Sequence, residues 1–288
     1  MTVPNSGQGH SALPDRTKGP TRWVAYIVSM SDLEREYSPS SRVGGDAGPF
    51  VADYVARSAA AAALLGGTVT TLPGGTLLAA AGPGAPLLVF VHGGYWQALS
   101  AATSLYPAPA ALALGWSYAA VEYTIAPAGT VAGMVRECRD ALAVLAGVVR
   151  PAGVVLVGHS AGAHLAAMVS LAAGSPLPVD RTVLLSGVFD LRPLLQTTVN
   201  DALGLDDSSA MALSPQLLPV AAHHEVVVAW GDNETDAFKL QSRAYAKHLE
   251  LSGSPVLSLG CSGRHHFDIV DDVVDPSTTL GQLALGDS

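Results

Sequence analysis

Short apolar runs alternate along this chain with longer segments whose apolar residues recur at helical spacing. From residue 86 onwards, the runs that we expect to be strands occupy residues 86–91, 117–123, 153–158, 181–187, 225–231 and 255–260. Helical patterns are expected at 100–114, at 131–149, from Ala161 onwards and at 236–250. Runs that are apolar on both faces are typical of parallel strands covered by helices on each side. The alternation therefore predicts an α/β fold with an open, mostly parallel sheet and right-handed crossovers.

The earlier part of the chain predicts an antiparallel opening to this sheet. The segments "TVTTL" (68–72) and "TLLAAA" (76–81) flank "PGG", which is a turn signal. No internal repeat is visible, and 288 residues suit one α/β domain. We expect a leader over residues 1–22 and a single domain over 23–288, with a small cap inserted at about 188–220.

Charge and composition exclude several classes of partner. The chain has 15 basic residues and a formal net charge of −9, without the clusters of Lys and Arg that nucleic acid requires. The start has no apolar signal region, and the alanine-rich run "ARSAAAAALLGG" is too short to span a membrane. We therefore expect a cytoplasmic protein without membrane or nucleic-acid partners. Cys138 and Cys261 lack CxxC spacing and are expected as small core residues in a reducing compartment.

The segment "GHSAG" (158–162) follows an apolar run and precedes the helical pattern "AGAHLAAM". A Gly-x-Ser-x-Gly pattern alone is weak evidence, but this position between strand and helix is typical of a nucleophile elbow. Gly158 and Gly162 would leave room where a Cβ would clash, and Ser160 would lie at a helix N-terminus that favours negative charge. The alternative is that Ser160 simply caps a structural helix.

The apolar run at 86–91 ends in "HGGYW" (92–96), which is an unusual way to end a buried strand. Attack of a serine on a carbonyl creates an oxyanion that needs hydrogen-bond donors already in place. We expect these donors to be backbone N–H groups of Ala161 and of Gly93 and Gly94, whose missing side chains allow a close approach. His92 is expected to hold this loop by hydrogen bonding rather than to act as a base.

Two large rings follow these glycines. Tyr95 and Trp96 are expected at the rim of the same cavity. They could stack against an aromatic substrate or simply pack in the core, and both interpretations remain open here.

The end of the chain offers a base and the preceding loop an acid. "RHHFD" follows the last expected strand, and we favour His266 over His265 as the base. The loop "GDNETDAF" follows "EVVVAWG" and offers Glu234, Asp232 and Asp236 as the acid that orients it. We favour Glu234, with Asp232 as the alternative and Asp236 as a helix N-cap. The remaining histidines lack carboxylates at ligand spacing, so neither a metal nor another cofactor is expected.

With these residues placed, the chain resembles the kynurenine formamidase (arylformamidase) family of the α/β-hydrolase fold. The resemblance runs over about residues 31–275 and rests on these blocks, in order: "LEREYSPSSRV" (33–43), "HGGYW" (92–96), "EYTIAP" (122–127), "GHSAGAHLAAM" (158–168), "SGVFDLRPL" (186–194), "ETDAFKLQS" (234–242) and "HHFDIV" (265–270). "GHSAGAHLA" is shared with hormone-sensitive-lipase-like esterases and discriminates little. The resemblance implies Ser160 as nucleophile, His266 as base and Glu234 as acid, although the family more commonly has aspartate at that position.

The resemblance also implies a reaction. N-formyl-L-kynurenine would be hydrolysed to L-kynurenine and formate through a formyl-enzyme on Ser160, in tryptophan breakdown or in a dedicated biosynthetic route. The expected partners are an aromatic formamide and water, with a homodimer left open; Arg192 is one candidate for binding the amino-acid end. Two alternatives remain, a carboxylesterase for small acyl esters with the same triad and a non-catalytic binding protein of the same fold.

Overall fold

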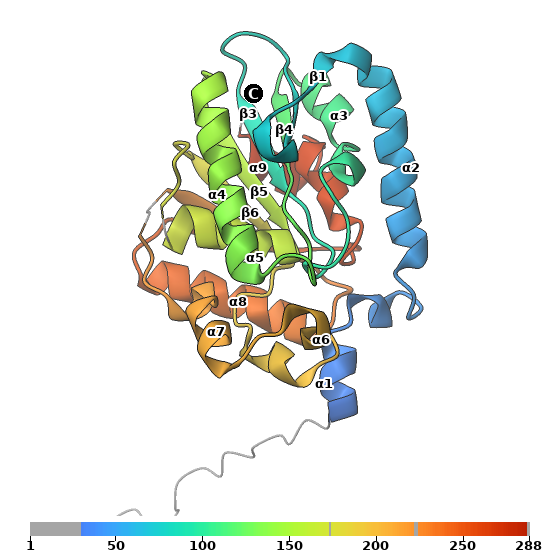
Figure 1. Ribbon diagram of the computed structural model, residues 1–288, viewed down its shortest axis with the longest axis vertical. Coiled ribbons are helices and arrows are strands. Elements are labelled where there is room, and N and C mark those ends of the chain that lie inside the picture. Colours follow the sequence, from blue (N-terminus) through green and yellow to red (C-terminus); the bar gives the residue numbers. More distant parts are fainter. Residues whose placement is uncertain (1–29, 173, 222–223, 287–288) are drawn as a thin grey trace, which may run out of the picture.

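One sheet runs through the part of the chain that the structure describes, residues 30–172, 174–221 and 224–286 of a computed structural model (Figure 1). The expected leader at 1–22 lies outside these residues. Eight strands in this part are ordered β1-β2-β4-β3-β5-β6-β7-β8. They are β1 (Val69–Thr71), β2 (Leu77–Ala79), β3 (Leu87–Val91), β4 (Ser117–Val121), β5 (Val154–His159), β6 (Arg181–Leu185), β7 (Glu225–Gly231) and β8 (Val256–Cys261).

The pairing of these strands agrees with the expected sheet. β1 pairs with β2 in antiparallel fashion, as does β2 with β4, and β4-β3-β5-β6-β7-β8 is parallel throughout. The antiparallel opening and the mostly parallel sheet are therefore both confirmed. Because β3 and β5 are neighbours in register, the segments that follow Val91 and His159 lie side by side at the carboxyl edge.

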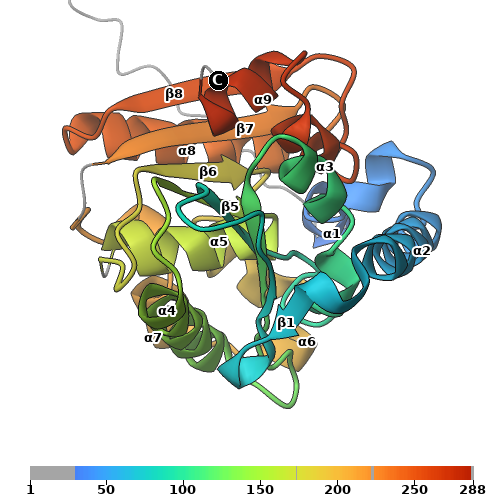
Figure 2. The same cartoon turned by 90° about the horizontal axis from the view of Figure 1, so that it is seen from above.

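Helices cover both faces of this sheet (Figure 2). They are α1 (Met30–Glu36), α2 (Gly48–Leu65), α3 (Ala108–Ala113), α4 (Val131–Val148), α5 (Ala161–Ala167), α6 (Asn200–Leu203), α7 (Asp207–Ala212), α8 (Asp236–Leu251) and α9 (Thr279–Leu285). α4, α5 and α8 pack over one face, whereas α2, α3 and α9 pack over the other. No helix in the described residues is both long and apolar enough to cross a membrane.

Successive residues of a strand place their side chains alternately in these two cores. In β3, Val89 and Val91 face the core under α4, α5 and α8, whereas Leu88 and Phe90 face the opposite core. β8 differs, because it lies at the edge of the sheet and most of its residues are partly or fully exposed. Cys138 and Cys261 are both buried, as expected, and they belong to different cores.

The helix expected at 100–114 forms in two pieces. A short 3-10 turn spans Ala102–Ser104, and α3 begins only at Ala108. Pro107 and Pro109 lie at the N-cap and in the first turn of α3. Proline has no N–H and is tolerated only in the first turn of a helix, so one helix cannot run through both positions.

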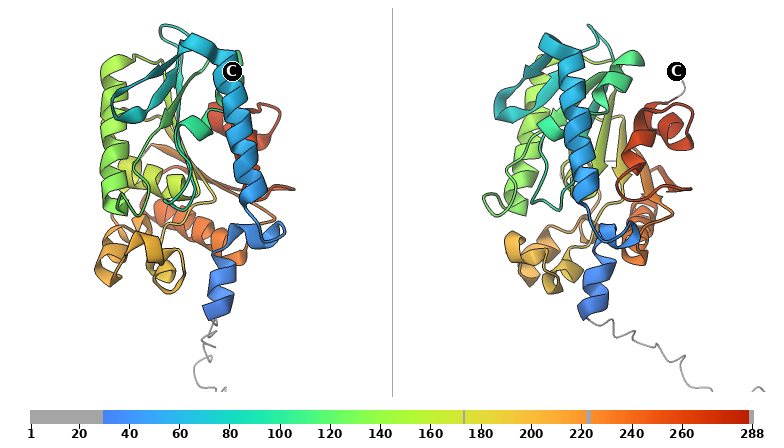
Figure 3. Two further views of the ribbon diagram at one scale, coloured as in Figure 1. Left: turned by 45° about the vertical axis from the view of Figure 1, so that its right-hand side comes forward. Right: turned by 90° about the vertical axis from the view of Figure 1, so that its right-hand side faces the viewer.

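The segment between β6 and β7 consists of short helical pieces. These are the 3-10 turn Arg192–Gln196, α6, α7 and the 3-10 turn Pro215–Leu217. α6 and α7 lie with α1 at one end of the molecule, and α2 runs along one side (Figures 1 and 3). The backbone N–H of Thr198 donates to Glu34 Oε2 at 2.9 Å, so this segment contacts α1 directly.

Candidate active site

Ser160 lies at the sharp turn between β5 and α5, with φ 56° and ψ −118°. This positive φ is a strained conformation for a residue with a side chain, and such strain is typical of functional turns. A Cβ on Gly158 would lie 2.3 Å from the carbonyl oxygen of Gly162, and a Cβ on Gly162 would lie 2.0 Å from that of Val91. Gly158 therefore leaves room for the start of α5, and Gly162 leaves room for the end of β3.

His266 and Glu234 meet Ser160 at this turn. His266 Nε2 lies 3.0 Å from Ser160 Oγ, and His266 Nδ1 lies 3.0 Å from Glu234 Oε2. All three residues are buried, with at most 3% of their surface exposed. The three groups form a continuous hydrogen-bonded chain of hydroxyl, imidazole and carboxylate.

The Glu234 carboxylate is held on both oxygens. Its Oε1 accepts hydrogen bonds from Ser186 Oγ at 2.5 Å and from the backbone N–H of Gly231 at 2.6 Å. Burial raises the pKa of this carboxyl, but the hydrogen bonds from His266, Ser186 and Gly231 outweigh burial and hold its pKa below the usual value. The carboxylate is therefore ionised at neutral pH and fixes the orientation of the imidazole.

The alternative acids lie elsewhere. Asp232 accepts a hydrogen bond from the backbone N–H of Gly263 at 3.0 Å. Asp236 is exposed and forms an ion pair with Lys239 at 3.1 Å. The expectation that Asp236 is the N-cap is wrong, because the N-cap of α8 is Thr235, whose hydroxyl donates to the Glu36 carbonyl.

The loop that carries His266 is fixed on both sides. Its carbonyl oxygen lies 2.7 Å from Nε2 of the buried His159. Burial, and next the neighbouring His266, lower the pKa of His159 to about 3, so His159 is neutral and Nε2–H donates to that carbonyl. The neighbouring His265 instead places its Nδ1 3.4 Å from Asp268 Oδ1.

The loop after β3 brings glycines against Ser160. A Cβ on Gly93 would lie 3.1 Å from the Cβ of Ser160, and one on Gly94, at φ +94°, would lie 2.3 Å from the Ala98 carbonyl oxygen. In the described residues, the N–H groups of Gly93, Gly94 and Ala161 have no hydrogen-bond acceptor. Free amides beside a serine hydroxyl are what an oxyanion requires.

The carbonyl groups of the same loop are held from behind. The hydroxyl of Tyr123 donates to the carbonyl oxygens of His92 at 2.9 Å and Gly93 at 3.1 Å. The His92 ring is buried, stacks on Tyr123 with centroids 4.1 Å apart, and its Nδ1 lies 2.9 Å from the Gly93 carbonyl oxygen. His92 thus contacts the loop and not Ser160, which agrees with its expected structural role.

The two rings after these glycines have different surroundings. Tyr95 lines the cavity that contains Ser160, and its hydroxyl donates to the Tyr37 carbonyl. Trp96 is instead 0% exposed and packs edge-on against His164 in the core, with centroids 5.2 Å apart. The expectation that Trp96 lies at the cavity rim is corrected by this packing.

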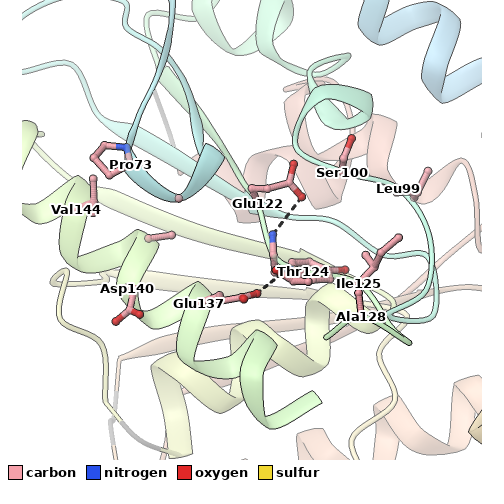
Figure 4. A pocket seen from close by; sticks show the side chains of 13 residues that line it. Pro73, Leu99, Ser100, Glu122, Thr124, Ile125, Ala128, Glu137, Asp140 and Val144 are labelled. Carbon is pink, nitrogen blue, oxygen red and sulfur yellow. Dashed lines mark hydrogen bonds between the residues drawn. The ribbon is translucent and has the colours of Figure 1, made fainter. Parts of the chain in front are cut away.

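The cavity at Ser160 has a volume of about 320 Å³, within the range of small-molecule sites. A larger hollow of about 660 Å³ lies elsewhere, beside Glu122, Glu137 and Asp140 (Figure 4). It shares only Leu99 with the lining of the Ser160 cavity. Within the described residues, no group of three or more His, Cys, Asp or Glu side chains is arranged to hold a metal ion.

This chain is similar in sequence to proteins of a known family. Residues 88–268 match the family model described as the alpha/beta hydrolase fold. The kynurenine formamidase of Danio rerio is 37% identical over 213 residues, which cover 70% of this chain and 73% of the relative. The chain belongs to the kynurenine formamidase family of the α/β-hydrolases. The family member of Salmo salar is also 37% identical, over 69% of this chain and 72% of its own.

Solved structures share the fold. A crystal structure from Silicibacter sp. tm1040 has a TM-score of 0.78 at 26% identity and covers 88% of this chain and 99% of its own. The esterase of Pyrobaculum calidifontis has a TM-score of 0.62 at 18% identity, covering 89% of this chain and 94% of its own. The α/β-hydrolase fold predicted from the sequence is therefore confirmed.

The block "LEREYSPSSRV" (33–43) forms a wall of the site that the sequence patterns did not predict. This block comprises most of α1 and the 3-10 turn Pro39–Arg42, and it brings Glu34 and Tyr37 to the cavity. α2 adds Tyr54, whose hydroxyl donates to the Phe267 carbonyl. The resemblance of the block to the family is the one sequence signal for Glu34 and Tyr37, and Tyr54 lies outside that block.

Proposed function

We propose that this chain is an arylformamidase that hydrolyses N-formyl-L-kynurenine to L-kynurenine and formate. The hydrogen-bonded chain Ser160–His266–Glu234 beside free backbone amides carries this proposal. We infer the substrate from the similarity of this chain to kynurenine formamidases. The cavity beside Ser160 is lined largely by aromatic and aliphatic side chains, which suits an anilide ring.

The first half-reaction forms a formyl ester on the enzyme. His266 Nε2 takes the proton of Ser160 Oγ while that oxygen attacks the formyl carbon. The carbonyl oxygen becomes an oxyanion, which accepts hydrogen bonds from N–H groups of Gly93, Gly94 and Ala161. The imidazolium then donates its proton to the arylamine nitrogen, the C–N bond breaks, and the aryl amine leaves.

The second half-reaction uses water. His266 takes a proton from a water molecule as the water oxygen attacks the formyl ester. The imidazolium returns that proton to Ser160 Oγ as the C–O bond to Ser160 breaks, and formic acid leaves and ionises to formate in solvent. Glu234 holds Nδ1–H of the imidazole and stabilises the imidazolium in both halves without taking the proton. The depressed pKa of its carboxyl agrees with this role.

The substrate has a small acyl group on one side of the bond that Ser160 would cleave and a large aromatic amine on the other. A formyl group has only a hydrogen on its carbonyl carbon, so it needs almost no room on the acyl side. On the other side, Tyr95, Tyr54 and Phe267 line the cavity and can contact the anilide ring.

We further propose a cytoplasmic location, a role in tryptophan breakdown, a cap at 188–220 and a homodimer.

The test is a side-by-side turnover assay of purified protein on N-formyl-L-kynurenine and on p-nitrophenyl acetate. We expect the formamide to have the higher kcat/KM, whereas turnover of the ester alone would indicate a carboxylesterase. Ser160→Ala should lower kcat by at least about 10⁴-fold with an unchanged circular dichroism spectrum. Activity retained in this variant would contradict the whole mechanism.

A further inference from the structure

The cavity at Ser160 has an uneven charge distribution. Among the described residues that line it, Glu34 is the one carboxylate, and no Lys or Arg side chain contributes. His159 also lines it and is neutral, because burial lowers its pKa to about 3. His266 lines the cavity too, as the proposed base. Apart from the proton that His266 would carry during the reaction, a ligand meets one negative charge and no Lys or Arg from these residues.

The Glu34 carboxylate is held in position. The backbone N–H of Thr198 donates to its Oε2 at 2.9 Å, and the Thr198 hydroxyl donates to its Oε1. A carboxylate offers about four lone-pair sites, so after the two bonds from Thr198 each oxygen keeps one site that no described residue fills. Glu34 is thus oriented by the protein while retaining acceptors for a ligand.

Glu34 lies at the aromatic side of the cavity. Tyr95 lines the same space and is bonded through its hydroxyl to the Tyr37 carbonyl, one turn after Glu34 on the chain. Burial raises the pKa of Tyr95, and the charge of Glu34 adds to this effect, which agrees with their proximity. Ser160 belongs to the β5–α5 turn, so nucleophile and carboxylate reach one cavity from separate elements.

We infer that Glu34 binds the α-ammonium group of the substrate and makes this a specificity site for cationic aromatic formamides. The inference rests on the proposed function. An ammonium has three donors and no acceptor, and it matches the two free acceptor sites of Glu34 in both charge and hydrogen bonding. The substrate carboxylate gains no ion pair from the described lining residues, so recognition depends on the ammonium far more than on the carboxylate.

The cation considered for the amino-acid end from the sequence is engaged elsewhere. Arg192 forms hydrogen bonds through Nε and Nη2 to both carboxylate oxygens of Asp190, at 2.9 and 2.7 Å. It does not line the cavity at Ser160. Arg192 is therefore not available at this site to bind a substrate carboxylate.

The test uses four formamides that differ at one end only. They are N-formyl-L-kynurenine, its decarboxylated amine, its deaminated acid and 2-formamidoacetophenone, which carries neither group. For the native protein we expect the two ammonium compounds to have kcat/KM values about tenfold to a hundredfold above the two that lack it. Removal of the carboxylate should cost less than removal of the ammonium.

Glu34→Gln keeps the shape of the side chain and removes its charge. We expect the ratio of kcat/KM between ammonium compounds and their ammonium-free counterparts to fall about tenfold or more, mainly through a higher KM. Glu250→Gln removes the same charge from the exposed surface of α8, where Glu250 pairs with Lys247, and should leave the ratio unchanged. Thermal unfolding of both variants establishes that they are folded.

Three results would overturn the inference. An unchanged ratio in Glu34→Gln, or an equal loss on all four compounds, would assign Glu34 a structural role only. A native preference for the deaminated acid over the decarboxylated amine would place a cation at the site. Turnover of p-nitrophenyl acetate with none of the formamides would instead reject the proposed function, and the inference with it.

Discussion

The Tyr123 hydroxyl lies 2.9 Å from the carbonyl oxygen of His92, and the rings of the two residues stack with centroids 4.1 Å apart. Tyr123 thus ties β4's end to the glycine loop after β3. Holding a carbonyl from behind fixes the peptide plane, and with it the direction of the neighbouring N–H groups. The loop that faces Ser160 is positioned by a side chain that does not itself line the Ser160 cavity.

We predict that Tyr123→Phe lowers kcat about fivefold to thirtyfold with little change in KM, because the lost hydrogen bonds loosen donors that act in the transition state. Tyr118→Phe is a matched control. Its hydroxyl is also buried and donates to a backbone carbonyl, that of Ser104 at 2.6 Å, away from the loop. Steady-state kinetics should separate the two variants; equal kcat values would show that Tyr123 serves stability only.

Glu234 is predicted to be the acid on which turnover depends. Glu234→Ala should lower kcat about 10²- to 10⁴-fold, because the imidazole loses its orienting partner. Glu234→Asp should recover part of this loss, since the carboxylate remains but is one methylene shorter. Asp232→Ala should cost less than about tenfold, because among the described residues the Asp232 carboxylate accepts one hydrogen bond, from the Gly263 amide, and does not contact His266. A larger loss at Asp232 than at Glu234 would contradict the assignment.

Stability should decrease on acidification because of buried histidines. Burial lowers the pKa of His164 to about 4 and that of His159 to about 3, against an ordinary value of 6.5. Below 6.5 the unfolded chain takes up protons that the folded chain does not, so the free energy of unfolding falls as pH falls towards these values. Each histidine contributes a slope of up to about 1.4 kcal/mol per pH unit.

His164→Gln tests this coupling outside the catalytic residues. His164 Nε2 lies 2.7 Å from the Leu213 carbonyl oxygen, and glutamine can donate in its place. Urea unfolding at about pH 7 and about pH 5 should give a smaller pH dependence for the variant than for the native protein. The same dependence in both proteins would mean that His164 takes up no proton on unfolding.

The elbow should tolerate no side chain at Gly162. Gly162→Ala places a Cβ 2.0 Å from the Val91 carbonyl oxygen and 2.4 Å from that of His92, so it should cost more than about 4 kcal/mol or prevent folding. Gly147→Ala is the opposite case, because Gly147 lies within α4 with nothing within 4 Å of a new Cβ. It should stabilise the protein by about 0.5–1 kcal/mol in thermal unfolding.

Continuous apolar patterns predicted the regular elements well. The run at 225–231 is β7, and the helical pattern at 131–149 is α4, which ends one residue earlier. The pattern at 100–114 failed because apolar spacing does not register the effect of Pro107 and Pro109 on backbone hydrogen bonding. The local apolar pattern is therefore sufficient to predict a helix or strand where no proline interrupts it.

The candidate site was predictable where its residues directly follow strands. Ser160, Glu234 and His266 each lie in a segment just after a parallel strand, and such segments meet at one edge of the sheet. Tyr95 and Trp96 have φ values of 52° and 59°, and Tyr95 lines the cavity while Trp96 is in the core. Neighbouring residues at such a turn cannot be assigned to cavity or core from their identity alone.

Residues of the segment 30–65 line the cavity at Ser160, whereas Ser160, Glu234 and His266 all lie later in the chain. This segment precedes every strand of the described sheet, and it is fastened to the His266 loop by the Tyr54 bond and by stacking of Phe50 on Phe267, with centroids 4.5 Å apart. Under the proposed function, substitutions in this segment would change which substrates fit the cavity and leave the strand ends that carry Ser160, Glu234 and His266 unchanged. Enzymes that share this fold can therefore differ in the substrates they accept while they keep the same catalytic residues.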